Sequence, residues 1–513
     1  MSTNYISTRL KTFASKRFRD TFAKRTNGEV GFIFIGRSFE YANVENIDSI
    51  TDTVKDEKTI WDNMIVAKQI EPGDVELVIP RYNWIANTVY KQYDDMAYTS
   101  DLARPDVANN IQQFYIINSE GNVYKCLSNN ASANSTVEPT GNYTSANGYI
   151  ITSDDYVWKY MYNVEASNRF LTTNWIPVPF NVPQDDNPDY NMDYNSLIDG
   201  AINLIVVDEP GSGYYHKTHN YSYIAGENYL VTTDISNVAV GMTVTGDGIL
   251  SGVTYVTNVD TDSNRVFLSY PTISSGNTFT TTTRVVIEGD GSDASASVVL
   301  NGDSVHKIVV VSSGSDYTRA NVTLFGTSNN AIVRAVLPPK HGHGYMPAIE
   351  LYSKAVLIVK RIGDIDSTDS GVIPTDISFR QYGILMSPHL YNTDTQVSYN
   401  VTNNVVTQTT DVTVADGLPY TQNEFVYQGT SLENSNFSGL VVSQTDTVIK
   451  LTNVKGTPDI GSLLKGNTVF RPVVSYTNPY FEAYSGNIIY VNNISAIERA
   501  EGQSEEIKII IKC

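Results

Sequence analysis

The chain has 513 residues and a formal charge of −20, from 55 acidic and 35 basic side chains. This length exceeds what one hydrophobic core usually supports, so we expect several domains, and the acidic excess argues against a nucleic-acid groove lined by Lys and Arg. Aromatic residues make up 11% and charged residues only 18%, a balance that argues against disorder and favours folded β structure with broad protein contacts.

The first 25 residues predict a basic, amphipathic helix. It contains one acidic residue, Asp20, and seven basic residues: Arg9, Lys11, Lys16, Arg17, Arg19, Lys24 and Arg25. We expect an apolar face to pack inward while the basic face meets acidic neighbouring protein; the inward residues would be Ile6, Leu10, Phe13 and Phe22. A DNA-binding arm is the alternative. The segment lacks the apolar core of a signal peptide, and no stretch approaches the about 18 apolar residues of a membrane span, so we expect a soluble protein without membrane insertion.

Short, uncommon signatures follow in the first 200 residues and return near the end of the chain. They are Ile35-Gly36-Arg37-Ser38, Trp61 with Met64, Val78-Ile79-Pro80-Arg81 with Trp84, Asp155-Tyr156-Val157-Trp158-Lys159-Tyr160, Phe379-Arg380-Gln381, and residues 486–511. Each is weak alone, and only the ordered set is specific.

Between residues 200 and 340 the sequence repeats a strand that runs into a glycine turn. The first copy reads Ile202-Asn203-Leu204-Ile205-Val206-Val207 and then Pro210-Gly211-Ser212-Gly213-Tyr214; the second reads Val305-His306-Lys307-Ile308-Val309-Val310-Val311 and then Ser313-Gly314-Ser315-Asp316-Tyr317. In the second copy two further strands, 321–326 and 331–336, follow at once. In the first copy the matching strands, 285–289 and 294–300, follow only after a long detour, which we interpret as an insertion.

Two additions show short strands separated by Gly, Asn and Asp turns, which predicts small β modules. In the second addition, 439–442 and 448–451 are expected to form a hairpin. We therefore predict a mainly β, multidomain chain of β-sandwich type with a short N-terminal helix and nested small β domains. The predicted domains are an N-terminal core (1–200), a glycine-turn β-repeat domain (201–220 and 284–340), a nested β insertion (221–283), a core continuation with a short helix and strands (341–397), a second β insertion (398–475) and a C-terminal core hairpin (476–513).

Two elements of the core continuation and of the C-terminus can be placed more closely. Residues 347–354 predict a short helix with Pro347 in its first turn. The last strand alternates, so that Ile507, Ile509 and Ile511 share one face while Lys508 and Lys512 face water.

A search for catalytic, metal-binding and cofactor-binding patterns returns little. His341 and His343 lack a third metal ligand nearby, and their glycine-rich setting favours a turn. The acidic pairs could serve a glycosidase, but neighbours on a strand point to opposite faces; they are Asp94-Asp95, Asp154-Asp155 and Glu505-Glu506. Asp290 and Asp293 favour a solvated turn over a calcium loop. Cys126 and Cys513 fit no disulfide or metal pattern and are expected to be reduced thiols.

In this order the signatures resemble the gene-product-eight family of baseplate wedge subunits from contractile-tailed, T4-like bacteriophages. The resemblance covers residues 1–200, 346–395 and 476–513, where the tail is similar to the family's last hairpin, and leaves the additions unexplained. It implies a structural subunit of the virion's tail baseplate rather than an enzyme, without cofactor or metal. It further implies a homodimer, clamped within each wedge by other wedge proteins and assembled in the host cytoplasm. Independently of the resemblance, the additions could decorate the baseplate exterior and bind tail fibres or the cell surface.

Under this hypothesis the key residues are architectural. We expect Trp61, Trp84 and Trp158 as core or subunit-contact anchors, and Arg37, Arg81 and Arg380 to bind carboxylates or backbone carbonyls at buried seams. An ordinary intramolecular ion pair is an equal alternative for each arginine. The alternative function is a tail fibre or adhesin whose nested domains bind host surface glycans through Tyr-rich loops, Tyr214-Tyr215 and Tyr221-Ser222-Tyr223. A polysaccharide-degrading tail enzyme is a third.

Overall fold

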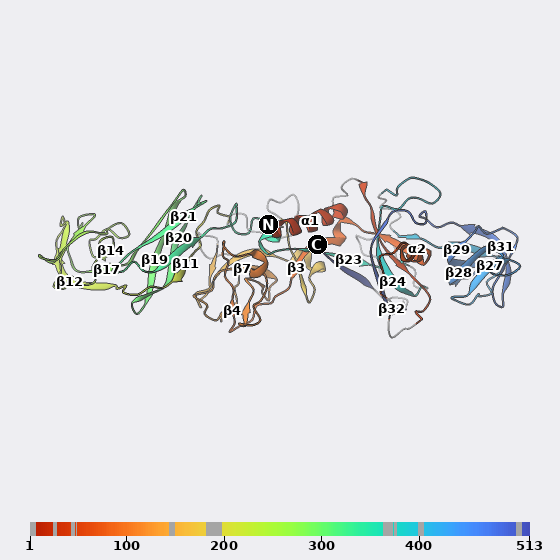
Figure 1. Cartoon of the computed structure of the whole chain (residues 1–513), viewed down its shortest axis with the longest axis horizontal. Helices are drawn as coiled ribbons and strands as arrows, with labels where there is room; N and C mark the ends of the chain where they lie inside the picture. Colours follow the sequence, from red (N-terminus) through yellow and green to blue (C-terminus); the bar gives the residue numbers. More distant parts are fainter. Residues whose placement is uncertain are drawn as a thin grey trace, which may run out of the picture. The chain divides into compact units, whose positions relative to one another are not determined.

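The computed structural model describes residues 7–23, 28–42, 47, 49–142, 149–180, 197–362, 373, 377–398, 405–498 and 505–513. The protein is mainly β, with 45% strand and 9% helix, and it contains several sheets and a short N-terminal helix, which confirms the predicted fold class. The chain divides into two units, Met1–Thr12 with Val78–Lys354 and Phe13–Leu77 with Ala355–Cys513, and Figure 1 labels their elements. The finer domain boundaries stay predictions.

The first unit contains an antiparallel sheet with a tyrosine-rich core. Its strands, in spatial order, are β6 (Tyr115–Ile117), β7 (Asn122–Ser128), β9 (Val157–Asn163) and β8 (Ile150–Ile151). Trp158 of β9 is fully buried, stacks on Tyr156 at 5.6 Å and meets Tyr90 edge-on at 5.4 Å. The hydroxyl of the buried Tyr124 donates to the Gly141 carbonyl at 2.7 Å, so this tyrosine fills the core without leaving a polar group unsatisfied.

Short elements accompany this sheet. They are the parallel pair β4 (Val89–Tyr90) and β5 (Ile111–Gln112), the helices α3 (Thr99–Leu102), η3 (Glu165–Phe170) and α4 (Pro347–Glu350), and β10 (Trp175–Pro177), which pairs with β3 (Val75–Pro80). The helix predicted over 347–354 is therefore a single turn. It ends early because Tyr352 lies at φ 60°, outside the right-handed helical region.

A six-stranded sheet holds the glycine-turn repeat. Its strands, in spatial order, are β21 (Ala320–Phe325), β18 (Arg284–Gly289), β19 (Ser292–Asn301), β20 (Ser304–Ser315), β11 (Leu204–Glu209) and β22 (Ile332–Val336). Strand pairing follows the repeat: Ile205 pairs with Ile308, the matching position of the other copy. Ile205 also pairs with Ala335, and Ile308 pairs with Val298, again at matching positions. The two copies are thus related by an approximate two-fold axis that passes between Ile205 and Ile308.

The two glycine turns keep the same symmetry. The Tyr214 hydroxyl accepts the Ala331 amide at 3.1 Å, and the Tyr317 hydroxyl accepts the Ala294 amide at 3.4 Å. Gly211 and Gly314 lie at φ 61° and φ 59°, and a Cβ at either would collide with the backbone of Ala331 or Ala294, respectively. The turns therefore require glycine for both their backbone conformation and the close approach of the next strand.

The addition within the first copy folds as a separate small module. One of its sheets contains β12 (Lys217–Tyr223), β17 (Gly276–Thr282) and β14 (Thr243–Gly246), and the other contains β13 (Tyr229–Val231), β16 (Arg265–Leu268) and β15 (Val256–Asp260). The two sheets share a core that includes Leu230, Val244 and Phe279. Because this core is distinct from that of the repeat sheet, the addition has its own hydrophobic stabilisation.

The second unit is built on a five-stranded sheet. Its strands, in spatial order, are β25 (Val405–Thr407), β2 (Met64–Gln69), β1 (Gly31–Gly36), β24 (Phe379–Met386) and β32 (Asn487–Ile497). Helix α2 (Val54–Asp62) begins at Thr53, whose side chain accepts the Asp56 amide, and buries Trp61 in the core beside the sheet. A short helix, η2 (Pro72–Asp74), precedes β3.

The C-terminal strands do not form the predicted hairpin. Strand β32 pairs with β24, whereas β33 (Glu506–Lys512) pairs antiparallel with β23 (Ala355–Arg361) in a different sheet. The alternation along β33 is as predicted for Ile507 and Ile509, which are buried, while Ile511 is half-buried. The similarity of the tail to the family's last hairpin indicated two strands. It could not show that each strand pairs with a strand much earlier in the chain.

The inward face of helix α1 (Thr8–Ala23) matches the prediction at Phe22, which is buried, but not at Leu10 and Phe13. The inward residues are Thr12, Ser15, Arg19 and Phe22, spaced three or four apart, whereas Leu10 and Phe13 are 56% and 48% exposed. Arg19 pairs with Asp20 at 2.8 Å and with Glu76 at 3.3 Å, and burial of these ion pairs fixes the rotation of the helix. Ile6, Lys24 and Arg25 lie outside the described residues.

The second addition contains a closed, six-stranded barrel, drawn in blue in Figure 1. Its strands, in order around the barrel, are β26 (Thr410–Val414), β29 (Val448–Lys455), β28 (Ser435–Thr445), β27 (Phe425–Gly429), β30 (Leu463–Lys465) and β31 (Phe470–Thr477). The predicted hairpin is confirmed, because β28 and β29 pair antiparallel. The barrel has its own core, which includes Val412, Phe437 and Leu451.

Candidate functional site

Two of the arginines singled out by the sequence lie together in the second unit. Arg37 follows β1 in the left-handed conformation, and its carbonyl accepts the amide of Arg380 at 3.0 Å. The Arg380 guanidinium donates to the Ser38 carbonyl and lies 3.8 Å from the Glu40 carboxylate, with its side chain 11% exposed. The Arg37 guanidinium covers the ring of Tyr41 at 4.0 Å. Together these contacts fix the turn after β1.

This turn also contacts the barrel. The Ser38 hydroxyl donates to Asn423 Oδ1 at 2.9 Å, and Asn453 Nδ2 donates to Asn63 Oδ1 at 2.7 Å. Asn423 and Asn453 belong to the second addition, and both have positive φ. Two side-chain hydrogen bonds thus attach the barrel to Ser38, the last residue of the first signature, and to Asn63, which lies between Trp61 and Met64.

The remaining predicted residues are placed separately. Arg81 donates to the Thr172 carbonyl at 3.0 Å, and Trp84 is half-buried and donates from Nε1 to the Ser135 hydroxyl at 3.2 Å. Trp61 and Trp158 are core residues, 3% and 0% exposed. The arginines bind backbone carbonyls within the chain, one of the partners expected for them, while any role at an interface stays a prediction.

The acidic pairs have structural partners. Asp94 and Asp95 both bind the Arg334 guanidinium, at 2.7 and 3.2 Å, so these neighbours converge rather than diverge as expected for a strand; they lie in a loop. Asp154 accepts the Thr136 and Val137 amides. Burial raises the pKa of Asp154, but its hydrogen bonds from Thr152 and from these amides outweigh burial and lower that pKa. None of these contacts resembles paired catalytic carboxylates.

The other acids and both histidines also have structural roles. Asp290 accepts the amides of Thr318 and Arg319, as expected for a turn. His341 is half-buried and packs on Tyr345, whereas His343 is buried. Within the described parts of the chain, no three His, Cys, Asp or Glu side chains form a group that could hold a metal ion. No described helix is long and apolar enough to cross a membrane.

A buried ionic cluster was not predicted from the sequence. Lys125 of β7 is fully buried and pairs with Glu350 of α4, which also accepts the Gly344 amide at 2.8 Å. Burial raises the pKa of Glu350, but Lys125 and His343 outweigh it and lower that pKa to about 2. Burial and the Lys125 ammonium lower the pKa of His343 to about 3, so this imidazole is neutral at pH 7. The sequence signal for this cluster was Lys125 within the apolar strand β7, because Lys is rarely buried without a partner of opposite charge.

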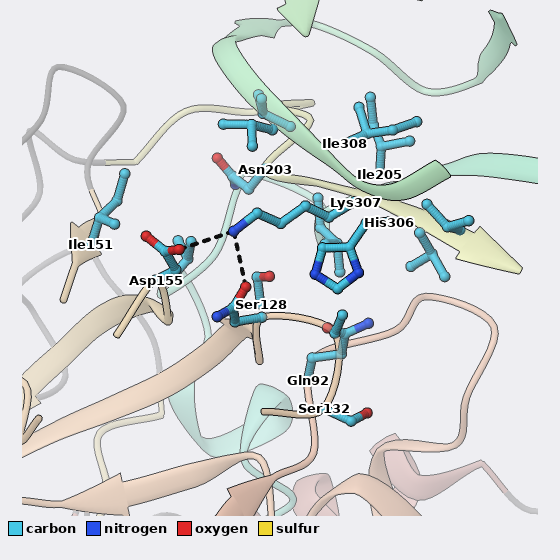
Figure 2. Close-up of a pocket in the computed structure, with 18 of the residues that line it drawn as sticks. Gln92, Ser128, Ser132, Ile151, Asp155, Asn203, Ile205, His306, Lys307 and Ile308 are labelled. Carbon is cyan, nitrogen blue, oxygen red and sulfur yellow. Dashed lines mark hydrogen bonds and ion pairs between the residues drawn. The ribbon is translucent and has the colours of Figure 1, made fainter. Parts of the chain in front are cut away.

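A polar cleft of about 380 Å³ lies in the first unit, against the β11–β20 pair (Figure 2). One wall is the face of these central strands around Ile205 and Ile308. The other wall comes from Gln92, from the loop after β7 at 128–132 and from the turn between β8 and β9 at Asp155. This volume is within the usual range of small-molecule sites, from about 300 to 1,000 Å³.

Lys307 spans the cleft. In Figure 2 its side chain reaches from β20 to Asp155, with Nζ 3.0 Å from Asp155 Oδ2 and 2.9 Å from Asn130 Oδ1. Both charges are partly exposed, so their stabilising contribution is small. Their proximity nevertheless leaves this part of the cleft without net charge.

Several polar groups in the cleft have no hydrogen-bond partner among the described residues. Asn203 Oδ1 is buried without one, and the exposed His306 also lines the cleft. Gln92 accepts the Asn129 amide through Oε1, which leaves its side-chain NH₂ available. Asn203 and His306 occupy matching positions of the two repeat copies, so the approximate two-fold axis brings them both to this cleft.

Comparison with known proteins identifies no relative: no family model matches the sequence, and no curated protein matches it.

Proposed function

We propose that this chain is a structural subunit of the baseplate wedge of a contractile, myovirus-type phage tail. It would lock neighbouring wedge proteins together and rearrange with them during tail contraction, acting as a homodimer among other wedge proteins. The ordered signature set supports the proposal. The proposed role is structural rather than enzymatic, in the virion's tail baseplate, after assembly in the host cytoplasm.

The observation that carries the proposal furthest is what the signature residues do in the fold. Arg81 and Arg380 bind main-chain carbonyls of distant segments, and Trp61 and Trp158 fill two separate cores. These positions fix the shape of the chain instead of converging on one reaction centre. Such rigidity suits a subunit that holds neighbours at defined positions, since a packed interior transmits force without deforming continuously.

The outward side of α1 offers a candidate contact with a partner. Leu10 and Phe13 are exposed there together with three basic side chains, Arg9, Lys11 and Arg17. Apolar anchors within a basic rim favour an acidic partner surface, and a second copy of this chain, with a charge of −20, would provide one. The inserted modules would bind tail fibres.

The proposal is tested by immunogold microscopy of intact and contracted phage particles, with one antibody against residues 1–200 and another against 221–283. We expect both labels at the tail tip. Label along fibres, or none on purified particles, would overturn the assignment. In sedimentation of the purified chain, Leu10→Asp should weaken dimerisation, whereas the matched control Val107→Asp, at a site that is 85% exposed, should not.

A further inference from the structure

We propose that the cleft between the β11–β20 pair and the 128–132 loop binds a neutral saccharide. The inference rests on the cleft alone and does not depend on the baseplate assignment. It also differs from the Tyr-rich loops suggested by the sequence, because no tyrosine of those loops lines the cleft. Two of them, Tyr214 and Tyr223, are buried with their hydroxyls bonded within the fold.

The polar groups that line the cleft indicate the chemistry of the ligand. Asn203 Oδ1 needs a donor, the Gln92 NH₂ group needs an acceptor, and the His306 imidazole can provide either. A sugar hydroxyl donates and accepts at the same atom, so a polyhydroxylated ligand satisfies all three. A buried acceptor without a partner costs about 1–3 kcal/mol, which a bound hydroxyl would relieve.

The charge of the cleft favours a neutral ligand. Its ammonium and carboxylate, Lys307 and Asp155, lie 3.0 Å apart and compensate each other. An anionic or cationic ligand would have to break this pair to gain a counter-charge. The walls between the polar groups are β-branched side chains such as Val157 and Val206, which suit the C–H faces of a sugar ring.

The strand arrangement argues against a peptide bound by strand addition. Strands β11 and β20 are both paired on both sides within the order β19, β20, β11, β22, so the cleft contacts their face and offers no free edge. Addition of a peptide strand requires an open edge.

The loop that lines the cleft is preformed. Asn130, Ala131 and Ser132 have consecutive φ values of 50°, 54° and 65°, in the left-handed region that non-glycine residues seldom adopt. Lys307 holds Asn130, and the Ser132 amide donates to Asn129 Oδ1 at 3.0 Å. Backbone in sparsely populated conformations is concentrated at binding sites, where the surrounding structure holds it in place.

Saturation-transfer NMR on the full chain tests the proposal. The probes are glucose, galactose, N-acetylglucosamine and their disaccharides, with glucosamine and glucuronic acid as charged comparators. We expect transfer to at least one neutral sugar and about tenfold weaker binding of that sugar by Asn203→Leu and by His306→Ala. His306 is exposed, so its truncation leaves the fold intact. Asn220→Leu, at an exposed site on β12, is the matched control and should bind as the parent does.

Three outcomes would overturn the proposal. One is the absence of transfer to every neutral sugar. Another is binding that both cleft variants leave unchanged, because the sugar would then occupy a different site. The third is preferential binding of a charged comparator by the parent chain, which would contradict the compensated charge of Lys307 and Asp155.

Discussion

The buried Lys125–Glu350 pair allows the most demanding test of the packing in the first unit. Lys125→Met removes the ammonium but keeps an unbranched side chain of similar length. Glu350, 4% exposed, then retains the Gly344 and Met346 amides, at 2.8 and 3.2 Å, and loses its only ammonium partner among the described contacts. Removing one partner of a buried ion pair leaves an uncompensated charge and costs about 3–5 kcal/mol.

A second substitution separates this charge effect from a packing effect. Glu350→Gln keeps an oxygen for the two amides while removing the negative charge, but alone it strands the Lys125 ammonium and should cost a similar amount. The double variant removes both charges, so its stability should return to within about 1–2 kcal/mol of the parent. A large, favourable coupling between the two substitutions is therefore expected.

Global unfolding is a poor readout for this pair, because a chain with several cores does not unfold in one step. Hydrogen exchange of peptides covering 122–128 and 344–350 reports local opening instead. Peptides from the barrel, 435–455, are the internal control. Unchanged local protection in Lys125→Met, or a double variant as unstable as the sum of the single variants, would refute the reasoning.

Four further predictions concern acid stability, packing, the repeat and the first addition. Because the pKa of His343 is lowered from its ordinary value of 6.5 to about 3 in the folded state, the unfolded state binds more protons between these values. Stability should therefore decrease as the pH falls from 6.5 to 3, and His343→Phe should reduce this loss in pH-dependent hydrogen exchange. Gly31→Ala should cost about 1–3 kcal/mol of local stability, measured by hydrogen exchange of peptides covering 31–36, since its Cβ would meet the Phe22 ring, whereas Gly73→Ala, with open space, should cost less. Tyr214→Phe and Tyr317→Phe should each cost about 0.5–1.5 kcal/mol of local stability, measured by hydrogen exchange of peptides covering 331–336 and 294–301, with the larger loss for the shorter bond at Tyr214. Replacing 217–282 by a short linker should leave hydrogen exchange in β19 and β20 unchanged; loss of protection there would show that the addition supports the repeat sheet.

Local patterns in the sequence predicted local structure well. The repeat of strand and glycine turn around Ile205 and Ile308 was predicted, because both are encoded within a few residues. That the two copies pair with each other at matching positions is seen only in the structure. The inward face of α1 was predicted correctly at Phe22 but wrongly at Leu10 and Phe13, because the prediction did not include the buried Arg19, which pairs with Asp20 and Glu76. A helical pattern cannot show an ion pair to a segment 57 residues away.

The candidate sites depend on contacts that sequence spacing does not encode. Lys125 and Glu350 are 225 residues apart, and Lys307 and Asp155 are 152 apart. Arg37 and Arg380 were both singled out, but their contact through one backbone hydrogen bond was not predicted. Each residue type suggested a need for a partner, and only the folded chain identifies which partner meets that need.

Both additions enter and leave their host domains on paired strands. Lys217 pairs with Thr281 at the base of the nested module, and Asp411 pairs with Thr477 at the base of the barrel. The two ends of each addition therefore lie next to each other, as the ends of an ordinary turn do. The entropic cost of closing such an insertion grows only slowly with its length. Since each addition also has its own core, a host sheet can acquire it without giving up buried apolar area. For this reason the segment between matching strands is longer in one copy of the repeat than in the other, although both copies keep the same strand register. The signature residues lie outside both modules.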